Sequence, residues 1–210
     1  MVFYYQYQSF YNMFESIPLK YSIILASGSP RRQQFFKDLN IPFTIKYFDV
    51  EEKFDKKLKR EEITNYLSEL KGKPFDGNIL DNELVITSDT IVWFEDKALG
   101  KPKTRDEAFE MLCGLSKNVH EVISSISFKT KNSIRTIHDV TKVFFNELST
   151  DEINFYIDNF HPFDKAGSYG IQEWIGYIGV KKIEGNYSNV MGLPLPKLYN
   201  FLKNELPLLK

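Results

Sequence analysis

Tyr-Ser-Ile-Ile-Leu-Ala-Ser-Gly-Ser-Pro-Arg-Arg, residues 21–32, is the stretch of sequence that decides the fold. Its first half, 21–26, is an apolar run that ends in small residues, which predicts a buried strand. A helical apolar pattern over 33–39 follows the turn, and Asn40 and Pro42 mark the end of that helix. We therefore expect a strand, a small-residue turn and a helix in succession.

The rest of the chain alternates between strand and helix patterns, without a repeat or a low-complexity linker. Helices are expected over 60–71, which is amphipathic, over 104–112 and from 149, both with capping-box sequences, and from 194. Strands are expected over 43–50 and 84–93, over 119–128 and 135–145 as a hairpin, and over 180–183 and 187–190 as a terminal pair. These patterns predict an α/β or α+β fold, in which helices flank a mixed sheet and turns line a cleft.

The composition of the 210 residues, 42% of them apolar, indicates one domain over 21–210, preceded by an aromatic-rich extension over 1–20. The 27 basic and 28 acidic residues nearly cancel, so no overall field attracts nucleic acid or an anionic membrane. No stretch approaches the ~20 apolar residues of a membrane span, and 1–20 lacks the features of a signal peptide. A single cysteine, Cys113, is expected to be a small buried residue in a reducing compartment. We therefore expect a cytoplasmic protein.

The turn over 27–32 has the features of an anion site. Ser29 can cap the helix and Pro30 can be its first residue, which leaves backbone N–H groups free at the positive end of the helix dipole. Gly28 permits close approach of a ligand to the backbone. Hydroxyl and forked guanidinium donors suited to phosphate come from Ser27, Ser29, Arg31 and Arg32. The turn by itself fits an ordinary capped helix with two solvated arginines equally well.

Asp89 lies in the middle of the apolar stretch 84–93. Burial of an unpaired carboxylate is costly, so Asp89 must be paired, bound to a metal or placed where the strand opens into a cleft. A structural salt bridge is the commoner explanation of such a residue taken alone. Lys71 and Lys101 are the lysines that local structure places best to neutralise a triphosphate, and each also fits a solvated surface lysine.

Glu52 follows the expected strand 43–50 and precedes a charged stretch that is typical of a solvated face. If Glu52 meets Asp89 across a cleft, the two carboxylates form an oxygen site suited to Mg²⁺ or Mn²⁺. The three histidines lack the spacing of metal ligands, which argues against zinc.

Gln172 ends a glycine-rich run, Asp-Lys-Ala-Gly-Ser-Tyr-Gly-Ile-Gln over 164–172. The glycines allow a flat ligand to approach the backbone. The amide of Gln172 carries both a donor and an acceptor, which are needed to recognise one edge of a nucleobase. Taken alone, such a glycine-rich run is more commonly an ordinary turn.

Taken together, these motifs resemble the Maf family of nucleoside triphosphate pyrophosphatases, house-cleaning enzymes once described as septum-formation inhibitors. The matching motifs are Ser-x-Ser-Pro-Arg-Arg at 27–32, Asp-Thr at 89–90, Gly-Lys-Pro at 100–102, the run 164–172, and Val-Met-Gly-Leu-Pro at 190–194. The match covers 22–202, in order and with compatible spacing. It implies a Maf/ITPase-like twisted mixed sheet with a cleft between two lobes.

The resemblance also implies roles for individual residues. Asp89 would be the catalytic carboxylate, which orients or deprotonates the attacking water or binds metal, and the Gly-Ile-Gln ending is similar to the subgroup that acts on dTTP and UTP. Base choice would involve Arg31, Thr90 and Gln172. The triphosphate and a divalent cation would be bound by Ser27, Arg31, Arg32, Glu52, Lys71 and Lys101. The resemblance further implies a homodimer and a role that touches cell division arrest.

Two departures from the family pattern leave alternatives open. Thr87 and Ser88 stand where the family usually has Gly-Ala, and Lys71 is followed by Gly72 rather than alanine, so Lys73 is an alternative to Lys71. Two other functions also remain: an inosine or xanthosine triphosphate pyrophosphatase, and a nucleotide-binding regulator of septum formation without turnover.

Overall fold

The computed structural model describes residues 21–206, so the expected extension over 1–20 lies outside the described residues. A seven-stranded mixed sheet in the order β2-β1-β3-β5-β6-β7 forms the centre, with β4 paired to the outer part of β3. The strands are β1 (Ser22–Leu25), β2 (Thr44–Ile45), β3 (Glu83–Phe94), β4 (Lys97–Leu99), β5 (Val119–Lys129), β6 (Ile134–Phe145) and β7 (Val180–Glu184). β1 is parallel to β2 and β3, and the other pairs are antiparallel.

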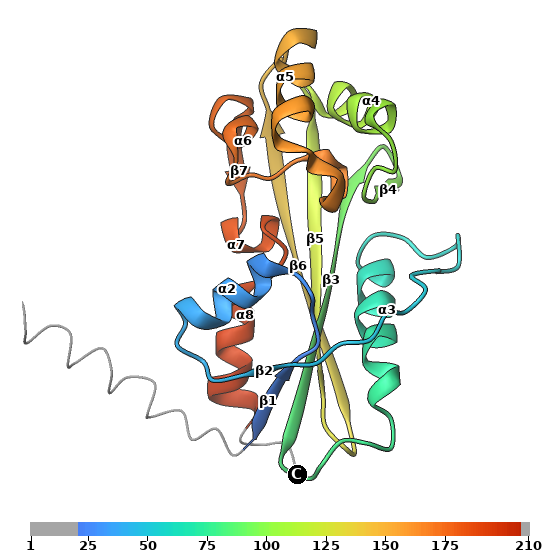
Figure 1. Cartoon of the computed structure of the whole chain (residues 1–210), viewed down its shortest axis with the longest axis vertical. Helices are drawn as coiled ribbons and strands as arrows, with labels where there is room; N and C mark the ends of the chain where they lie inside the picture. Colours follow the sequence, from blue (N-terminus) through green and yellow to red (C-terminus); the bar gives the residue numbers. More distant parts are fainter. Residues whose placement is uncertain (1–20, 207–210) are drawn as a thin grey trace, which may run out of the picture.

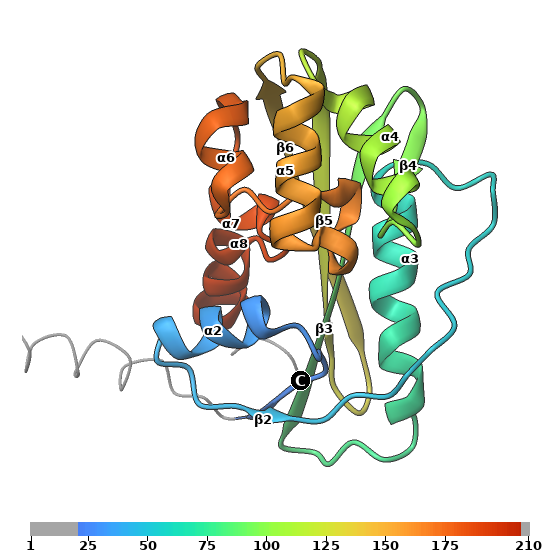
Figure 2. The same ribbon diagram turned by 45° about the horizontal axis from the view of Figure 1, so that its top comes forward.

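Helices cover both faces of the long strands (Figures 1 and 2). α2 (Pro30–Asp38) and α8 (Leu195–Asn200) cover one end of the sheet, and α4 (Arg105–Leu115), α5 (Thr150–Phe160) and α6 (Trp174–Gly179) gather at the other end. α3 (Glu61–Gly72) runs along the opposite side of β3. Short helical segments are η1 (Lys73–Phe75), η2 (Pro162–Asp164), η3 (Ala166–Ser168), α7 (Tyr187–Val190) and η4 (Phe201–Glu205).

The alternation of side chains along β3 explains this arrangement. Leu84 and Ile86 pack with α2 and α8, and Val92 on the same face packs with α4 and α5. Ile91 and Trp93 point to the other face and pack with α3. Successive residues of a strand point to opposite faces, so one long strand supports a separate apolar core at each end and a third under α3. The two-lobed mixed fold expected from the sequence is confirmed.

The register of β3 leaves a gap along one edge. β1 pairs with β3 as far as Leu25 and Ile86, and β4 pairs with it only from Val92. Within the described residues, positions 87–91 therefore have no strand partner on that edge. A carboxylate in the middle of an apolar strand thereby reaches an opening of the sheet, which resolves the conflict that Asp89 presents in the sequence.

Local patterns predicted several elements well. Ser149 and Glu152 form the complete capping box of α5, and 119–145 forms the expected hairpin. Thr104 accepts a hydrogen bond from the backbone N–H of Glu107, whereas the Glu107 carboxylate accepts from Lys103 instead of completing the box. These elements depend on caps and periodicity within a few residues, which a sequence displays directly.

Three expectations were wrong. The strand expected over 43–50 is only two residues long, because residues beyond Ile45 line the cleft instead of pairing, and Phe48 packs against the buried ring of Phe75. Residues 187–190 form the helix α7 instead of a strand, because the side chain of Asn186 caps its first N–H groups. Cys113 is exposed, because the buried face of α4 passes through Leu112 and Leu115 and leaves Cys113 on the outer side of the helix. Within 21–206, no helix has the length and apolar character needed to cross a membrane.

Candidate active site

A cleft of about 730 Å³ lies at the open edge of β3. Its walls come from the turn 27–32, the segment 47–54, the end of α3, the middle of β3, the segment 98–103, the run 164–172 and residues 190–192. It contains the residues predicted from the sequence, which are Ser27, Ser29, Arg31, Arg32, Glu52, Lys71, Asp89, Thr90, Lys101 and Gln172. Segments distant in sequence therefore meet at one site.

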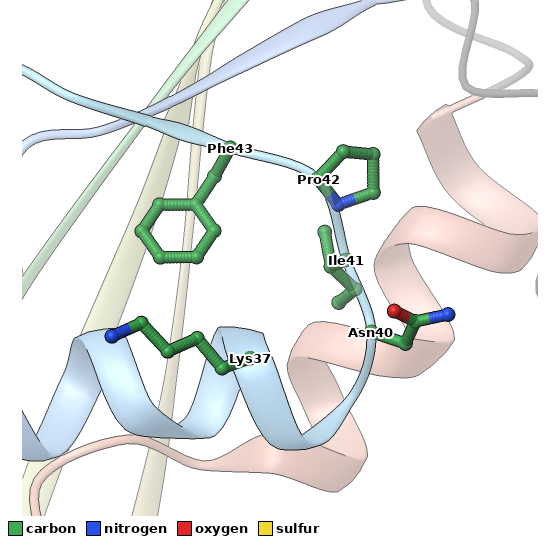
Figure 3. Close-up of a pocket in the computed structure, with 5 residues that line it drawn as sticks. All are labelled: Lys37, Asn40, Ile41, Pro42 and Phe43. Atoms are coloured by element: carbon green, nitrogen blue, oxygen red, sulfur yellow. The ribbon is translucent and has the colours of Figure 1, made fainter.

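A second depression of about 550 Å³ lies elsewhere, between the end of α2 and the following loop. Figure 3 shows the five residues that line it, which are Lys37, Asn40, Ile41, Pro42 and Phe43. None of the predicted site residues belongs to this group. The candidate site is therefore the cleft beside β3.

The turn 27–32 has the local structure of an anion site. Ser29 is the N-cap of α2 and Pro30 is its first residue, as expected. The hydroxyl of Ser27 accepts the Ser29 backbone N–H at 3.2 Å, whereas the side chain of Ser29 makes no capping hydrogen bond. The first N–H groups of a helix have no partner within the helix, so this turn offers donors to the cleft.

Arg31 and Arg32 differ in what they contact. Arg32 donates from Nε to the Gly192 carbonyl at 2.9 Å, and from its terminal nitrogens to the Ser88 carbonyl at 2.8 Å and to Thr90 Oγ1 at 3.1 Å. Three of its five donors are thus engaged, and burial lowers the pKa of Arg32 while the nearby Asp89 opposes that shift. Arg31 makes one ion pair, with Asp164 Oδ2 at 2.9 Å. Arg32 therefore anchors the turn to β3, and Arg31 spans the cleft.

Asp89 points toward α3 and is 5% exposed. Lys71 Nζ lies 2.6 Å from Asp89 Oδ1 and 3.0 Å from Glu52 Oε1, so one ammonium joins the two carboxylates. Burial raises the pKa of Asp89 above its ordinary value, and the attraction of Lys71 and Arg32 only partly opposes this. Glu52 is also partly desolvated, but Lys71, Lys101 and Arg32 together lower its pKa. Of the two carboxylates, Asp89 therefore takes up a proton more readily.

The geometry decides between Lys71 and Lys73. Lys71 lines the cleft and contacts Asp89, whereas Lys73 begins η1, is exposed and does not line the cleft. The hydroxyls of Thr87 and Ser88 are directed at backbone carbonyls, those of Ser68 at 2.6 Å and Gly192 at 3.4 Å. The two departures from the family pattern therefore leave the Asp89 carboxylate unobstructed.

Thr90 and Gln172 both line the cleft, Thr90 from β3 and Gln172 from the end of the run 164–172. Thr90 Oγ1 accepts from Arg32, shares a hydrogen bond of 2.8 Å with Ser124 Oγ and lies on the face of β3 opposite to Asp89. Gln172 is half-buried, and its backbone carbonyl accepts the Tyr177 hydroxyl at 3.0 Å. Thr90 and Gln172 thus add neutral polar groups to a cleft whose other polar lining residues are largely charged.

Sequence reasoning gave no role to several residues of the site. Lys165 is 8% exposed, lines the cleft and pairs with Asp164 Oδ1 at 2.7 Å and Glu173 Oε1 at 3.1 Å. Tyr47 also lines the cleft, with its ring over Gly28. Lys165 could have been predicted from the sequence, because it lies within the glycine-rich run 164–172. Tyr47 has no such signal, since its place depends on how far β2 extends.

Glu52 and Asp89 share the ammonium of Lys71, and two carboxylates placed so close together also suit a divalent cation. In the described part of the chain, no group of three or more His, Cys, Asp or Glu residues is arranged to hold a metal ion. Mg²⁺ commonly uses one or two protein carboxylates together with substrate phosphates, so Glu52 and Asp89 fit that requirement.

His120 is buried and its Nε2 lies 2.7 Å from Tyr169 Oη, so its contacts are those of a structural residue, as expected from the sequence.

Comparison with known proteins shows the family of this chain. The family described as "Maf-like protein" matches residues 22–205. The "dTTP/UTP pyrophosphatase" of Flavobacterium johnsoniae is 57% identical over 183 residues, covering 87% of this chain and 94% of the relative. That of Christiangramia forsetii is 53% identical over 194 residues, covering 92% and 99%, and that of Bacteroides fragilis is 46% identical, covering 88% and 96%.

A solved structure shares the fold. The Ham1 protein of Staphylococcus aureus superposes with a TM-score of 0.50 at 19% identity, over 88% of this chain and 99% of that chain. At this identity the likeness concerns the fold alone. The family match, by contrast, spans both lobes and every wall of the cleft. The chain belongs to the Maf family of Maf-like proteins.

Proposed function

We propose that this chain hydrolyses dTTP and UTP to the nucleoside monophosphate and pyrophosphate. The observation that carries the proposal is the placement of Asp89, a buried carboxylate at the open edge of β3, between Lys71 and the anion-binding turn 27–32. Relatives that bear the name dTTP/UTP pyrophosphatase support the choice of substrate.

In the proposed reaction, water attacks the α-phosphorus and the bond to the bridging oxygen breaks. Asp89 accepts a proton from the water or orients it, and pyrophosphate leaves with the electron pair of the broken bond. Lys71 and Lys101 stabilise the charge that develops on the leaving group, and Arg31 contributes to binding of the substrate. Because burial raises the pKa of Asp89, the residue is a better proton acceptor than an exposed aspartate.

Glu52 and Asp89 are the residues that would hold a divalent cation, Mg²⁺ or Mn²⁺. When bound, such an ion supplies neutralisation of the phosphate charge and polarisation of a phosphoryl oxygen. Lys71 contacts both carboxylates and compensates their charge. Addition of EDTA should therefore abolish turnover.

Gln172, Thr90 and Arg31 line the part of the cleft proposed to hold the base. A side-chain amide rejects a wrong base because its polar groups remain unpaired, which discriminates more strongly than size alone. We therefore expect pyrimidines to be preferred. The house-cleaning role and the cytoplasmic location follow as proposals from this activity. A homodimer is a further proposal, to be measured by light scattering.

The decisive test is incubation of the purified protein with Mg²⁺ or Mn²⁺ and a panel of dTTP, UTP, CTP, GTP, ITP and XTP, with pyrophosphate and orthophosphate assayed separately. Pyrophosphate release that is fastest from dTTP and UTP is expected. Orthophosphate release contradicts the mechanism, and a preference for ITP or XTP assigns the alternative substrate class. Tight binding without turnover assigns the regulatory alternative.

A further inference from the structure

A chain of polar contacts crosses the wall of the cleft that carries Gln172. Arg31 pairs with Asp164 Oδ2 at 2.9 Å, and Asp164 Oδ1 accepts from Lys165 Nζ at 2.7 Å. Lys165 Nζ in turn lies 3.1 Å from Glu173 Oε1. The chain continues behind this wall, where the other oxygen of Glu173 accepts the Tyr156 hydroxyl. Glu173 is thus the point at which the cleft residues join the core of the lobe.

The charges of these linked contacts balance around Lys165, whose side chain is the most buried of the four. Two cations, Arg31 and Lys165, alternate with two carboxylates, Asp164 and Glu173. Partial burial opposes ionisation of Asp164, but the hydrogen bonds from Lys165 and Arg31 outweigh it and lower the pKa of Asp164. Lys165 has a side chain that is 9% exposed, so it needs both carboxylates. Loss of either one would leave a buried ammonium short of a partner.

Glu173 also holds the backbone next to Gln172. Tyr156 Oη, which donates to Glu173, accepts the backbone N–H of Gly170 at 3.0 Å. The Glu173 N–H donates to the Gly170 carbonyl at 3.0 Å. A Cβ on Gly170 would lie 2.8 Å from Glu173 Cδ and 3.0 Å from Gln172 Nε2, so the two side chains pack against the same glycine. The position of the Gln172 amide therefore depends on that of the Glu173 carboxylate.

Glu173 itself is not among the residues that line the cleft, whereas Arg31, Asp164, Lys165 and Gln172 are. We infer that Glu173 is a positioning residue for base recognition, which acts on Gln172 through Tyr156 and Gly170 and on Arg31 through Lys165 and Asp164. This inference rests on the proposed function, since it concerns the same cleft. It assigns to the carboxylate a role in substrate discrimination rather than in the chemical step.

The test compares Glu173→Gln with the wild-type enzyme on UTP and ITP. The amide retains the shape of the side chain but leaves Lys165 with one carboxylate. We expect KM for UTP to rise roughly 10-fold or more, as is typical when a partner that orients a binding group is removed. kcat for UTP should change by less than about 3-fold, because Asp89 and Lys71 are untouched. The ratio of kcat/KM for UTP to that for ITP should fall.

Two further variants keep the test decisive. Glu147→Gln removes a carboxylate of an exposed ion pair with Lys117 and should leave both constants unchanged. Tyr156→Phe removes one hydroxyl from the link to Gly170 and should lower the UTP to ITP ratio in the same direction. Thermal unfolding of each variant checks that it is folded. If Glu173→Gln does not fold, Tyr156→Phe tests the inference instead. An unchanged ratio of kcat/KM for UTP to that for ITP in Tyr156→Phe overturns it.

Failure of the proposed function is recognised separately. If the wild-type protein releases no pyrophosphate from either nucleotide, the affinities of the α,β-imido analogues of UTP and ITP replace the kinetic constants. A lower preference for the uridine analogue in Glu173→Gln supports the inference. An equal preference in the variant and the wild type, or equal losses for both nucleotides, overturns it.

Discussion

The two walls of the cleft hold their charges in different ways. On the α3 wall, Lys71 contacts Asp89 and Glu52, and the Glu52 side chain is 48% exposed. On the opposite wall, Lys165 lies between Asp164 and Glu173, and its own side chain is 9% exposed. Exposed ion pairs contribute only about 0–1 kcal/mol, whereas a buried charge that loses its partner is costly. Glu52 on the α3 wall can therefore exchange its partner for a charged ligand at low cost, whereas the buried Lys165 on the other wall must keep its carboxylates.

This difference matches the division of labour proposed for the site. Phosphate groups and a metal ion bring their own charges, so the residues that receive them must release existing contacts at low cost. Recognition of a base requires donors and acceptors that keep their positions, because an adaptable group accepts the wrong base as well. Each of the following variants changes one wall or its attachment, and they are taken from the largest expected effect to the smallest.

Asp89→Asn tests the α3 wall most directly. The amide cannot accept a proton as the carboxylate does, so kcat should fall at least ~100-fold while nucleotide binding is retained. Pyrophosphate release and the binding of UTP give the two measurements. Asp81→Asn, at an exposed ion pair with Lys131, is the matched control and should behave as wild type. Activity retained in Asp89→Asn removes this residue from its role.

Arg32→Ala and Arg31→Ala compare an anchoring arginine with one that spans the cleft. Arg32 serves three acceptors, so its removal should lower the free energy of unfolding by about 2–3 kcal/mol. Arg31 makes one half-exposed ion pair, so its removal should cost less than about 1 kcal/mol and raise KM instead. Urea unfolding of both variants measures the difference. Equal losses of stability would contradict the distinction between these neighbours.

His120 makes the support of the wall that carries Lys165 sensitive to acid, because it holds the hydroxyl of the cleft residue Tyr169. Burial lowers the pKa of His120 from 6.5 to about 3. The folded protein therefore keeps the ring neutral, whereas the unfolded chain binds a proton below pH 6.5. The stability from the neutral ring is complete above pH 6.5 and is lost by about 1.4 kcal/mol per pH unit as the pH falls toward 3.

The measurement is the free energy of unfolding between pH 7 and pH 4 in the wild type and in His120→Phe. The variant begins from a lower stability, because Tyr169 loses its hydrogen-bond partner. The expected result is a flatter dependence on pH in the variant. Parallel curves would show that another group controls the acid sensitivity.

Gly28→Ala should have the smallest effect. A Cβ at this position would lie 3.0 Å from Tyr47 Cζ, and Tyr47 is 53% exposed, so its ring can turn aside. Stability should change by less than about 1 kcal/mol, since the ring moves into solvent. KM should rise modestly, because a displaced ring narrows the entrance to the turn 27–32. The double variant with Tyr47→Ala should recover the KM of Tyr47→Ala alone, and an additive effect would contradict the steric explanation.

Much of the fold was predictable because its signals are local. The strand and helix around 21–38, the amphipathic α3, the capped α5 and the hairpin of β5 and β6 follow from periodicity and capping residues. The helix over Tyr187–Val190 was missed although Asn186 caps it, because hydrogen bonds from Asn189 to Val122 and Thr141, which are distant in sequence, also fix this segment. The exposure of Cys113 was missed because the sequence predicted the helix but not which of its faces packs against the core.

The candidate site shows the same difference between local signals and contacts of residues distant in sequence. Asp89, Lys71, Glu52 and Gln172 were expected at one cleft, and the structure brings them together. Glu173 was not anticipated, because its contacts with Lys165 and Tyr156 depend on the packing of α5 beside the run 164–172.

The sequence by itself determined which chemical groups this protein carries: an anion-binding helix start, a carboxylate within an apolar strand, and a glycine-rich run that ends in an amide. These are properties of neighbouring residues and are legible without a fold. Only the tertiary structure decided which groups are engaged and which are available, such as Arg32 on the carbonyls of Ser88 and Gly192 and Arg31 across the cleft. The physical reason is that a charge or donor finds its partner through space, and its cost depends on the burial that packing of distant segments creates.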